Sequence, residues 1–153
     1  MHAVPEGAPI FTPNTRLAAE FDELMPKPGE KVIAKQHPGS FAGTDLDEYL
    51  GSLGDKGECS WRSEPRRGVE GSTGADACSV SAGKKIVLTG YMAHVCVSTT
   101  ARQAEQRGYE VVLAEDGIGD RDIPGATGEE VTKMVMNELG DAFGTVVQGS
   151  SIK

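Results

Sequence analysis

Hydrophobic positions recur at regular spacing in two parts of the chain, with an unpatterned stretch between them. In the first part, apolar residues at helical spacing predict an amphipathic helix over residues 17–25 and a second helix over residues 46–53. Residues 30–35 have the composition of a short buried strand. Thr44 and Asp47 have the spacing of a capping box, which predicts where the second helix begins.

The unpatterned stretch covers residues 55–83 and contains no Leu, Ile, Phe or Met. Gly, Ser, Arg and Glu dominate it, and Trp61 is its single large apolar residue. Such a segment buries too little apolar surface to offset the entropy that is lost on ordering. We therefore expect a disordered insertion within a single domain that spans residues 1–153.

Strand and helix patterns alternate in the second part of the chain. We predict strands over residues 85–89, 109–114 and 145–147, with one helix between each strand and the next. This alternation is typical of a mainly parallel sheet covered on both faces, so the predicted fold class is α/β, a three-layer α/β/α sandwich. The predicted apolar faces consist of Val97, Ala101 and Ala104 in the first helix, and of Val131, Met134, Val135 and Leu139 in the second.

Charge and composition narrow the classes of function. The chain has 23 acidic against 15 basic residues and a net charge of −8, which argues against nucleic acid or an anionic membrane as the main partner. No apolar run approaches the roughly 18 residues of a membrane span, and Pro5, Gly7 and Pro9 interrupt the N-terminus too early for a signal peptide. Three cysteines without a disulfide-framework spacing fit a reducing compartment, so we expect a cytoplasmic protein.

Cys96 is the candidate nucleophile. The run that starts at Lys85 is interpreted as a buried strand, a tight turn and a helix whose first residue is Cys96. Unpaired backbone N–H groups and the positive end of the helix dipole favour a thiolate at such a position. A thiolate is the nucleophilic form of cysteine. The alternative interpretation is a small buried residue that packs beneath the turn.

Three segments carry a resemblance to a known family. Residues 90–102, Gly-Tyr-Met-Ala-His-Val-Cys-Val-Ser-Thr-Thr-Ala-Arg, resemble the nucleophile motif of the isochorismatase-like cysteine hydrolases. Residues 32–35 and 40–46 resemble the family's strand that ends in the catalytic lysine and the turn that follows it. Residues 1–11 are similar to the exit from the family's second strand. The resemblance touches most of the chain outside the unpatterned stretch.

The resemblance implies the roles of several residues. The thiolate of Cys96 would attack the carbonyl of a small amide, ureido or related acyl substrate and form a thioester, which water hydrolyses. Lys35 would stabilise the thiolate, and the backbone N–H groups of Ala93 and Cys96 would form the oxyanion hole. The family usually carries a non-proline cis peptide just before the position of Ala93, which implies a cis bond at Met92–Ala93.

The third member of the family's catalytic group is an aspartate on its first strand. By resemblance this strand would precede Met1, so we expect an N-terminally truncated member whose first strand is missing. Two interpretations account for both the missing strand and the insertion over residues 55–83. One is an imperfect gene model with a lost upstream exon and a retained intron, and the other is a divergent paralogue with a regulatory loop.

Three further side chains are weaker candidates. His94 lies two residues before Cys96, and side chains so close across a tight turn diverge, so we expect His94 to shape the pocket or to satisfy backbone groups. Phe41 is expected, by resemblance, to form a wall of the pocket. Asp116 follows the predicted strand 109–114 and is interpreted as a loop or capping residue, with a place at the carboxyl edge of the sheet as the alternative.

We expect neither a metal nor a cofactor. Nicotinamidases of the family bind a metal through one aspartate and two neighbouring histidines, whereas His2, His37 and His94 are isolated in this sequence. Cys59 and Cys78 lack the CxxC spacing of a zinc or redox site. No GxGxxG motif follows a predicted strand, so a dinucleotide site is not indicated.

Two classes of function remain. The first is a metal-free cysteine hydrolase of a small-molecule substrate, working through Cys96 and Lys35. The second is a catalytically inactive truncated relative, a pseudoenzyme or binding module with flavodoxin-like architecture. Relatives are commonly oligomeric, so the resemblance also implies a homo-oligomer.

Overall fold

The computed structural model describes residues 15–16, 19, 21–53 and 84–152. The insertion predicted over residues 55–83 and the segment 1–11 lie outside the described residues, as does Leu17 of the first predicted helix.

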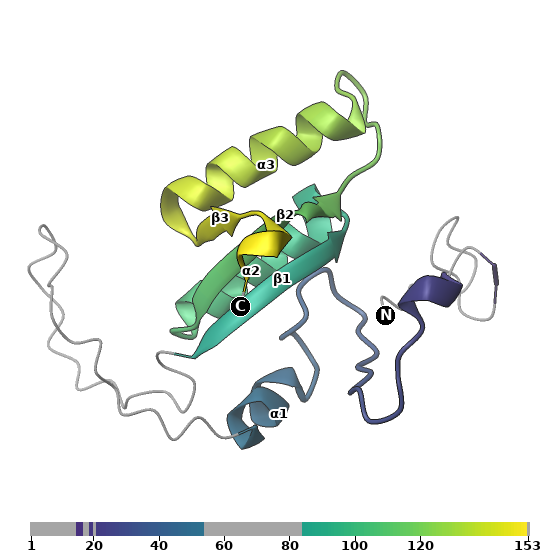
Figure 1. The fold of residues 1–153 in the computed structure, drawn as a ribbon, viewed down its shortest axis with the longest axis vertical. Coiled ribbons are helices and arrows are strands. Elements are labelled where there is room, and N and C mark those ends of the chain that lie inside the picture. Colours follow the sequence, from purple (N-terminus) through teal and green to yellow (C-terminus); the bar gives the residue numbers. More distant parts are fainter. Residues whose placement is uncertain (1–14, 17–18, 20, 54–83, 153) are drawn as a thin grey trace, which may run out of the picture.

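The described part of the chain is built around a parallel three-stranded sheet with the order β1-β2-β3 (Figure 1). Strand β1 is Lys85–Tyr91, β2 is Glu110–Gly119 and β3 is Thr145–Val147. Helix α2 (Ser98–Gln106) connects β1 to β2, and α3 (Gly128–Ala142) connects β2 to β3. The α/β sandwich class predicted from the alternation of elements is therefore confirmed. The remaining elements are α1 (Leu46–Ser52), the 3-10 turns Asp22–Leu24 and Gly149–Ser151, and the π-helical turn Ala93–Val97.

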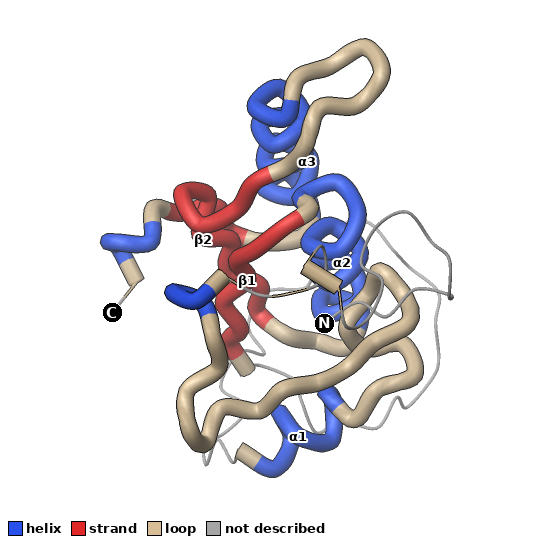
Figure 2. Tube along the Cα trace, turned by 90° about the vertical axis from the view of Figure 1, so that its right-hand side faces the viewer, coloured by secondary structure: helices blue, strands red, loops and turns tan. Residues whose placement is uncertain are grey.

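One face of the sheet packs against α2 and α3 and forms the core. Leu113 of β2 and Leu139 of α3 are the largest fully buried side chains of the described residues. The predicted apolar face of α2 is confirmed, since its residues are almost completely buried. On α3 one prediction is wrong, because Met134 is 67% exposed and Met136 is buried instead. Figure 2 shows α2 on one side of the strands and the C-terminal 3-10 turn on the other.

The N-terminal predictions are largely wrong. Among the described residues of the helix predicted over residues 17–25, the structure has only the 3-10 turn Asp22–Leu24, and Phe21 and Leu24 are 76% and 72% exposed. No strand forms over residues 30–35 among the described elements. A short amphipathic helix gains most of its stability from packing its apolar face, and here that face meets no partner in the described part of the chain.

Helix α1 is present but lacks the predicted capping box. Its N-cap residue is Asp45, whose side chain makes no capping hydrogen bond. The hydroxyl of Thr44 donates to the carbonyl of Ser40, and Asp47 accepts a hydrogen bond from the Tyr109 hydroxyl at 2.7 Å. Asp47 therefore ties α1 to the residue that precedes β2. The partly buried Leu46 and Leu50 pack against the core.

Strand β2 extends five residues beyond its predicted end because its pairing with β1 is irregular. Leu88 of β1 pairs with Leu113, but Gly90 pairs with Ile118, so β2 contains four residues between these pairs where β1 contains one. The extra residues bulge, and β2 then returns to β1 at Ile118 and Gly119. This return brings the end of β2 beside the end of β1.

The buried position of Leu139 leads to a stability prediction. We expect Leu139→Ala to lower the free energy of unfolding by about 2–5 kcal/mol, because it removes buried methyl groups and leaves a cavity. The exposed Met134 on the same helix provides the matched control, and Met134→Ala should change stability by less than about 0.5 kcal/mol. Urea denaturation of both variants checks this, and equal losses would contradict the described burial of α3.

Candidate active site

Cys96 lies at the carboxyl end of β1, in the π-helical turn Ala93–Val97 that opens the helical run into α2. The carbonyl of Met92 accepts hydrogen bonds from Val95 N at 3.3 Å and from Val97 N at 3.1 Å. The helical run therefore begins at Ala93, and Cys96 is its fourth residue. The prediction that Cys96 is the first residue of the helix is wrong. The thiol is free and half-buried. Its location at the carboxyl edge of a parallel sheet, where such folds bind ligands, is as predicted.

A non-proline cis peptide bond joins Tyr91 to Met92. The resemblance implied a cis bond one residue later, at Met92–Ala93, so that prediction is corrected by one position. The cis bond falls where β1 ends and the π-helical turn begins. The Met92 side chain is 6% exposed and Ala93 is completely buried, so the turn that precedes Cys96 is packed into the protein.

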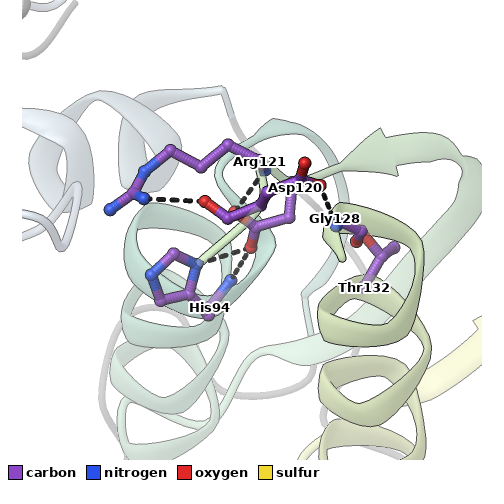
Figure 3. A network of polar contacts seen from close by, with 6 residues as sticks. His94, Asp120, Arg121, Gly128 and Thr132 are labelled. Carbon is purple, nitrogen blue, oxygen red and sulfur yellow. Dashed lines mark hydrogen bonds and ion pairs between the residues drawn. The ribbon is translucent and has the colours of Figure 1, made fainter. Parts of the chain in front are cut away.

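His94 and Asp120 form the principal polar contact of this edge (Figure 3). One carboxylate oxygen of Asp120, Oδ2, accepts a hydrogen bond from the backbone N–H of His94 at 2.7 Å and lies 2.6 Å from its ring Nδ1. The other oxygen, Oδ1, accepts from the backbone N–H of Arg121 at 2.8 Å. The Asp120 side chain is completely buried, whereas 27% of the His94 side chain is exposed.

These hydrogen bonds set the charge of Asp120. Burial by itself raises the pKa of the carboxyl group, because it disfavours the charged form. The N–H groups of the His94 backbone and ring and of the Arg121 backbone stabilise the carboxylate more strongly, and together they hold the pKa of Asp120 below its ordinary value of 3.8. Asp120 is therefore an anion at neutral pH.

The loop after Asp120 is anchored to the start of α3. Gly128 N donates to the carboxylate of Asp122 at 2.8 Å, and the Arg121 guanidinium donates to the Asp122 carbonyl at 3.0 Å. A Cβ atom on Gly128 would collide with the backbone of Asp120, so only glycine fits this close approach. Thr127 and Glu130 form a reciprocal capping box that fixes the first turn of α3.

Lys35 does not contact Cys96 in the structure. Its ammonium donates to the backbone carbonyls of Pro38 at 2.6 Å and of His37 at 3.1 Å. The loop after Lys35 therefore folds back and satisfies the ammonium locally. The pairing of Lys35 with Cys96 that the resemblance implied is not among the described contacts.

Phe41 belongs to the hydrophobic core. Its ring packs against that of Tyr109 with a centroid separation of 5.6 Å, and the Arg107 guanidinium lies 4.8 Å from its centroid. Tyr109 directly precedes β2, so these contacts are at the amino end of the sheet, whereas Cys96 follows the carboxyl end of β1. Phe41 thus packs as a core residue, and its expected role as a wall of the pocket stays a prediction.

A cavity of about 610 Å³ lies between the carboxyl end of β2 and α3. Asp120 is part of its wall, while neither Cys96 nor Lys35 is. The volume is in the usual range for small-molecule sites. Besides Asp120, the wall consists of Glu115, Ile118, Gly119, Gly128, Glu129, Thr132, Lys133, Met136 and Asn137.

Asp120 is the residue that the sequence interpretation missed. The sequence pattern indicated Asp116 instead. This residue lies inside β2 and accepts a hydrogen bond from Gly149 N at 2.7 Å, so it holds the C-terminal 3-10 turn. Asp120 stands four residues further on. The available signal was the apolar Ile118 between two glycines, which indicates that the strand resumes after Asp116.

Two negative findings apply to the described part of the chain. Within these residues, no three His, Cys, Asp or Glu side chains cluster in a way that could hold a metal ion. No helix there combines the length and the apolar character needed to cross a membrane.

The protein is of the α/β sandwich class, with a parallel sheet and a cysteine at the carboxyl edge of that sheet. A family model for the isochorismatase domain matches residues 71–150. The chain is 47% identical over 152 residues to the secreted isochorismatase effector Isc1 of Verticillium dahliae. The matched residues cover 99% of this chain and 65% of that protein. The chain therefore belongs to the isochorismatase family.

More distant comparisons agree. The chain is 28% identical over 146 residues to the uncharacterized isochorismatase family protein YddQ of Bacillus subtilis, covering 91% of this chain and 64% of that protein. The crystal structure of an isochorismatase from Pseudomonas putida has a TM-score of 0.71 and 26% identity, covering 94% of this chain and 62% of that one. The chain thus spans just under two thirds of the length of these relatives.

The expected cytoplasmic location is wrong. The relative from Verticillium dahliae is named a secreted effector, which contradicts the expectation. The expectation rested on the cysteine count, and this is a weak criterion because a secreted protein with a well-packed core does not require disulfides.

The Asp120 carboxylate leads to a prediction about stability and pH. Asp120→Ala leaves buried N–H groups without an acceptor, so we expect it to lower the free energy of unfolding by about 1–3 kcal/mol at pH 7. Because the pKa of Asp120 is lower in the folded state, its contribution is complete above pH 3.8 and is lost as the pH falls further. The difference between wild type and variant should therefore shrink in acid.

Asp116→Ala is the matched control, because it removes the same charge from an exposed carboxylate that accepts one backbone hydrogen bond. Urea denaturation between pH 7 and pH 3 measures both variants. A loss for Asp120→Ala no larger than for Asp116→Ala, or one that does not depend on pH, would contradict this account of Asp120.

Proposed function

We propose that this protein is a metal-free cysteine hydrolase that acts on a small amide, ureido or related acyl substrate. The observation that carries the proposal is the position of Cys96, a free thiol in a helical turn directly after the carboxyl end of β1. Membership of the isochorismatase family supports it. A free thiol at this position can act as the nucleophile of an acyl transfer.

The chemistry proceeds in two steps. The Cys96 thiolate attacks the substrate carbonyl, and the leaving amine takes up the proton that the thiol released and departs, which gives a thioester. Water then attacks the thioester, which releases the acid and returns the thiol. The backbone N–H groups of Ala93 and Cys96 stabilise the oxyanion of each tetrahedral intermediate.

Lys35 has the role of stabilising the thiolate in this proposal. Its ammonium is held by the carbonyls of His37 and Pro38, so reaching Cys96 requires the loop that follows it to open. The family resemblance of residues 32–35 supports the assignment. We also propose that the protein works outside the cell, as the name of the relative from Verticillium dahliae suggests, and that it forms a homo-oligomer.

The same contacts of Lys35 favour a second candidate function. An ammonium satisfied by local carbonyls is typical of a structural lysine. In this alternative the protein is a catalytically inactive relative that keeps the fold and binds a small molecule or a partner.

Selective alkylation of Cys96 distinguishes the two candidates. With limiting iodoacetamide near neutral pH, the hydrolase function predicts that Cys96 reacts about tenfold faster than Cys59 or Cys78, because a catalytic cysteine is activated as a nucleophile. Peptide mass spectrometry of each cysteine after timed quenching measures the three rates.

The control is the same chain unfolded in urea, in which the three thiols should react at similar rates. If Cys96 in the folded protein reacts no faster than in the unfolded chain, activation of the thiol is ruled out and the binding function is favoured.

A further inference from the structure

Asp120 contacts His94 through both the backbone and the ring of that residue. Its Oδ2 atom accepts from both the backbone N–H and the ring of the same residue, at 2.7 and 2.6 Å. The carboxylate is completely buried, and two of its three hydrogen bonds are to His94, on the first turn of the helical run that contains Cys96. The end of β2 is thereby fixed to the start of this turn.

The geometry also determines which ring nitrogen of His94 carries the proton. An ionised carboxylate only accepts hydrogen bonds, so the short contact requires a proton on Nδ1. In the neutral ring Nε2 is then without a proton and can accept a hydrogen bond. Figure 3 shows the opposite edge of the ring turned away from Asp120, and the side chain is partly exposed.

We propose that Asp120 is a positioning residue of this site. It fixes the turn that carries Cys96 through the backbone of His94, and it holds the His94 ring with Nδ1 protonated and Nε2 directed outward as an acceptor. Only the effect on turnover rests on the hydrolase function proposed above. The role of Asp120 in fixing the His94 tautomer stands independently of it.

The tautomer can be measured directly by ¹⁵N NMR of the labelled full chain at a pH where histidine is neutral. We expect His94 to be in the Nδ1–H form in the wild type, while the exposed His37 provides an internal reference. In Asp120→Asn this form should no longer dominate, because an amide can either donate or accept. In Asp116→Asn, the charge-matched control, the His94 signals should not change.

Turnover of p-nitrophenyl acetate, a small activated ester, is the second readout. We expect Asp120→Asn to lower kcat on the order of 10- to 100-fold with little change in KM, because small displacements of a catalytic group have effects of this size. Asp116→Asn should retain wild-type kcat. Near-UV circular dichroism verifies that each variant is folded.

Several outcomes would overturn the proposal. An Nε2–H tautomer of His94 in the wild type does so even if Asp120→Asn fails to fold. The proposal is also overturned if folded Asp120→Asn keeps the Nδ1–H tautomer of His94. The same holds if this variant keeps the kcat of the wild type. Lack of any Cys96-dependent turnover in the wild type counts against the hydrolase function, and the NMR measurement then decides the role of Asp120 alone.

Discussion

The candidate site depends on one buried carboxylate. Asp120 follows β2, yet its partners are on the turn that follows β1 and on its own neighbour Arg121. A buried charge is costly unless it is fully hydrogen-bonded, and a buried N–H without an acceptor is costly as well. Asp120 and the start of the π-helical turn satisfy each other's hydrogen-bonding needs. The consequence is that two strand ends, and with them Cys96, have a fixed relative position.

The second part of the fold could be predicted from the sequence because each of its elements is amphipathic and packs on its neighbours. The strand over residues 145–147 and the buried face of α2 were predicted correctly. The error at Met134 is one of helical phase. Val131, Val135 and Leu139 define the buried stripe, and Met136 also lies within it, while Met134 faces outward.

The rest depends on long-range contacts that no local pattern records. Asp120 becomes buried only because β2 bulges and then returns to β1 at Ile118, and the polar residues of the bulge resemble a loop in sequence. Similarly, Phe41 pairs with Tyr109 across more than 60 residues. The segments over residues 17–25 and 30–35 have the expected patterns, but local propensity does not maintain such short elements without packing partners. The position of Cys96 in the turn after a strand, in contrast, could be predicted from the local sequence.

The central claim is that the carboxyl edge of this sheet is a nucleophilic site built on Cys96. Trapping the covalent intermediate tests it most directly. The full chain is mixed with p-nitrophenyl acetate, quenched in acid within seconds and digested, and the acetylated peptides are identified by mass spectrometry. The account predicts a thioester on Cys96 that forms rapidly, decays with time and is absent from Cys96→Ala. Acetylation that spares Cys96, or that does not distinguish it from Cys59 and Cys78, would contradict the account.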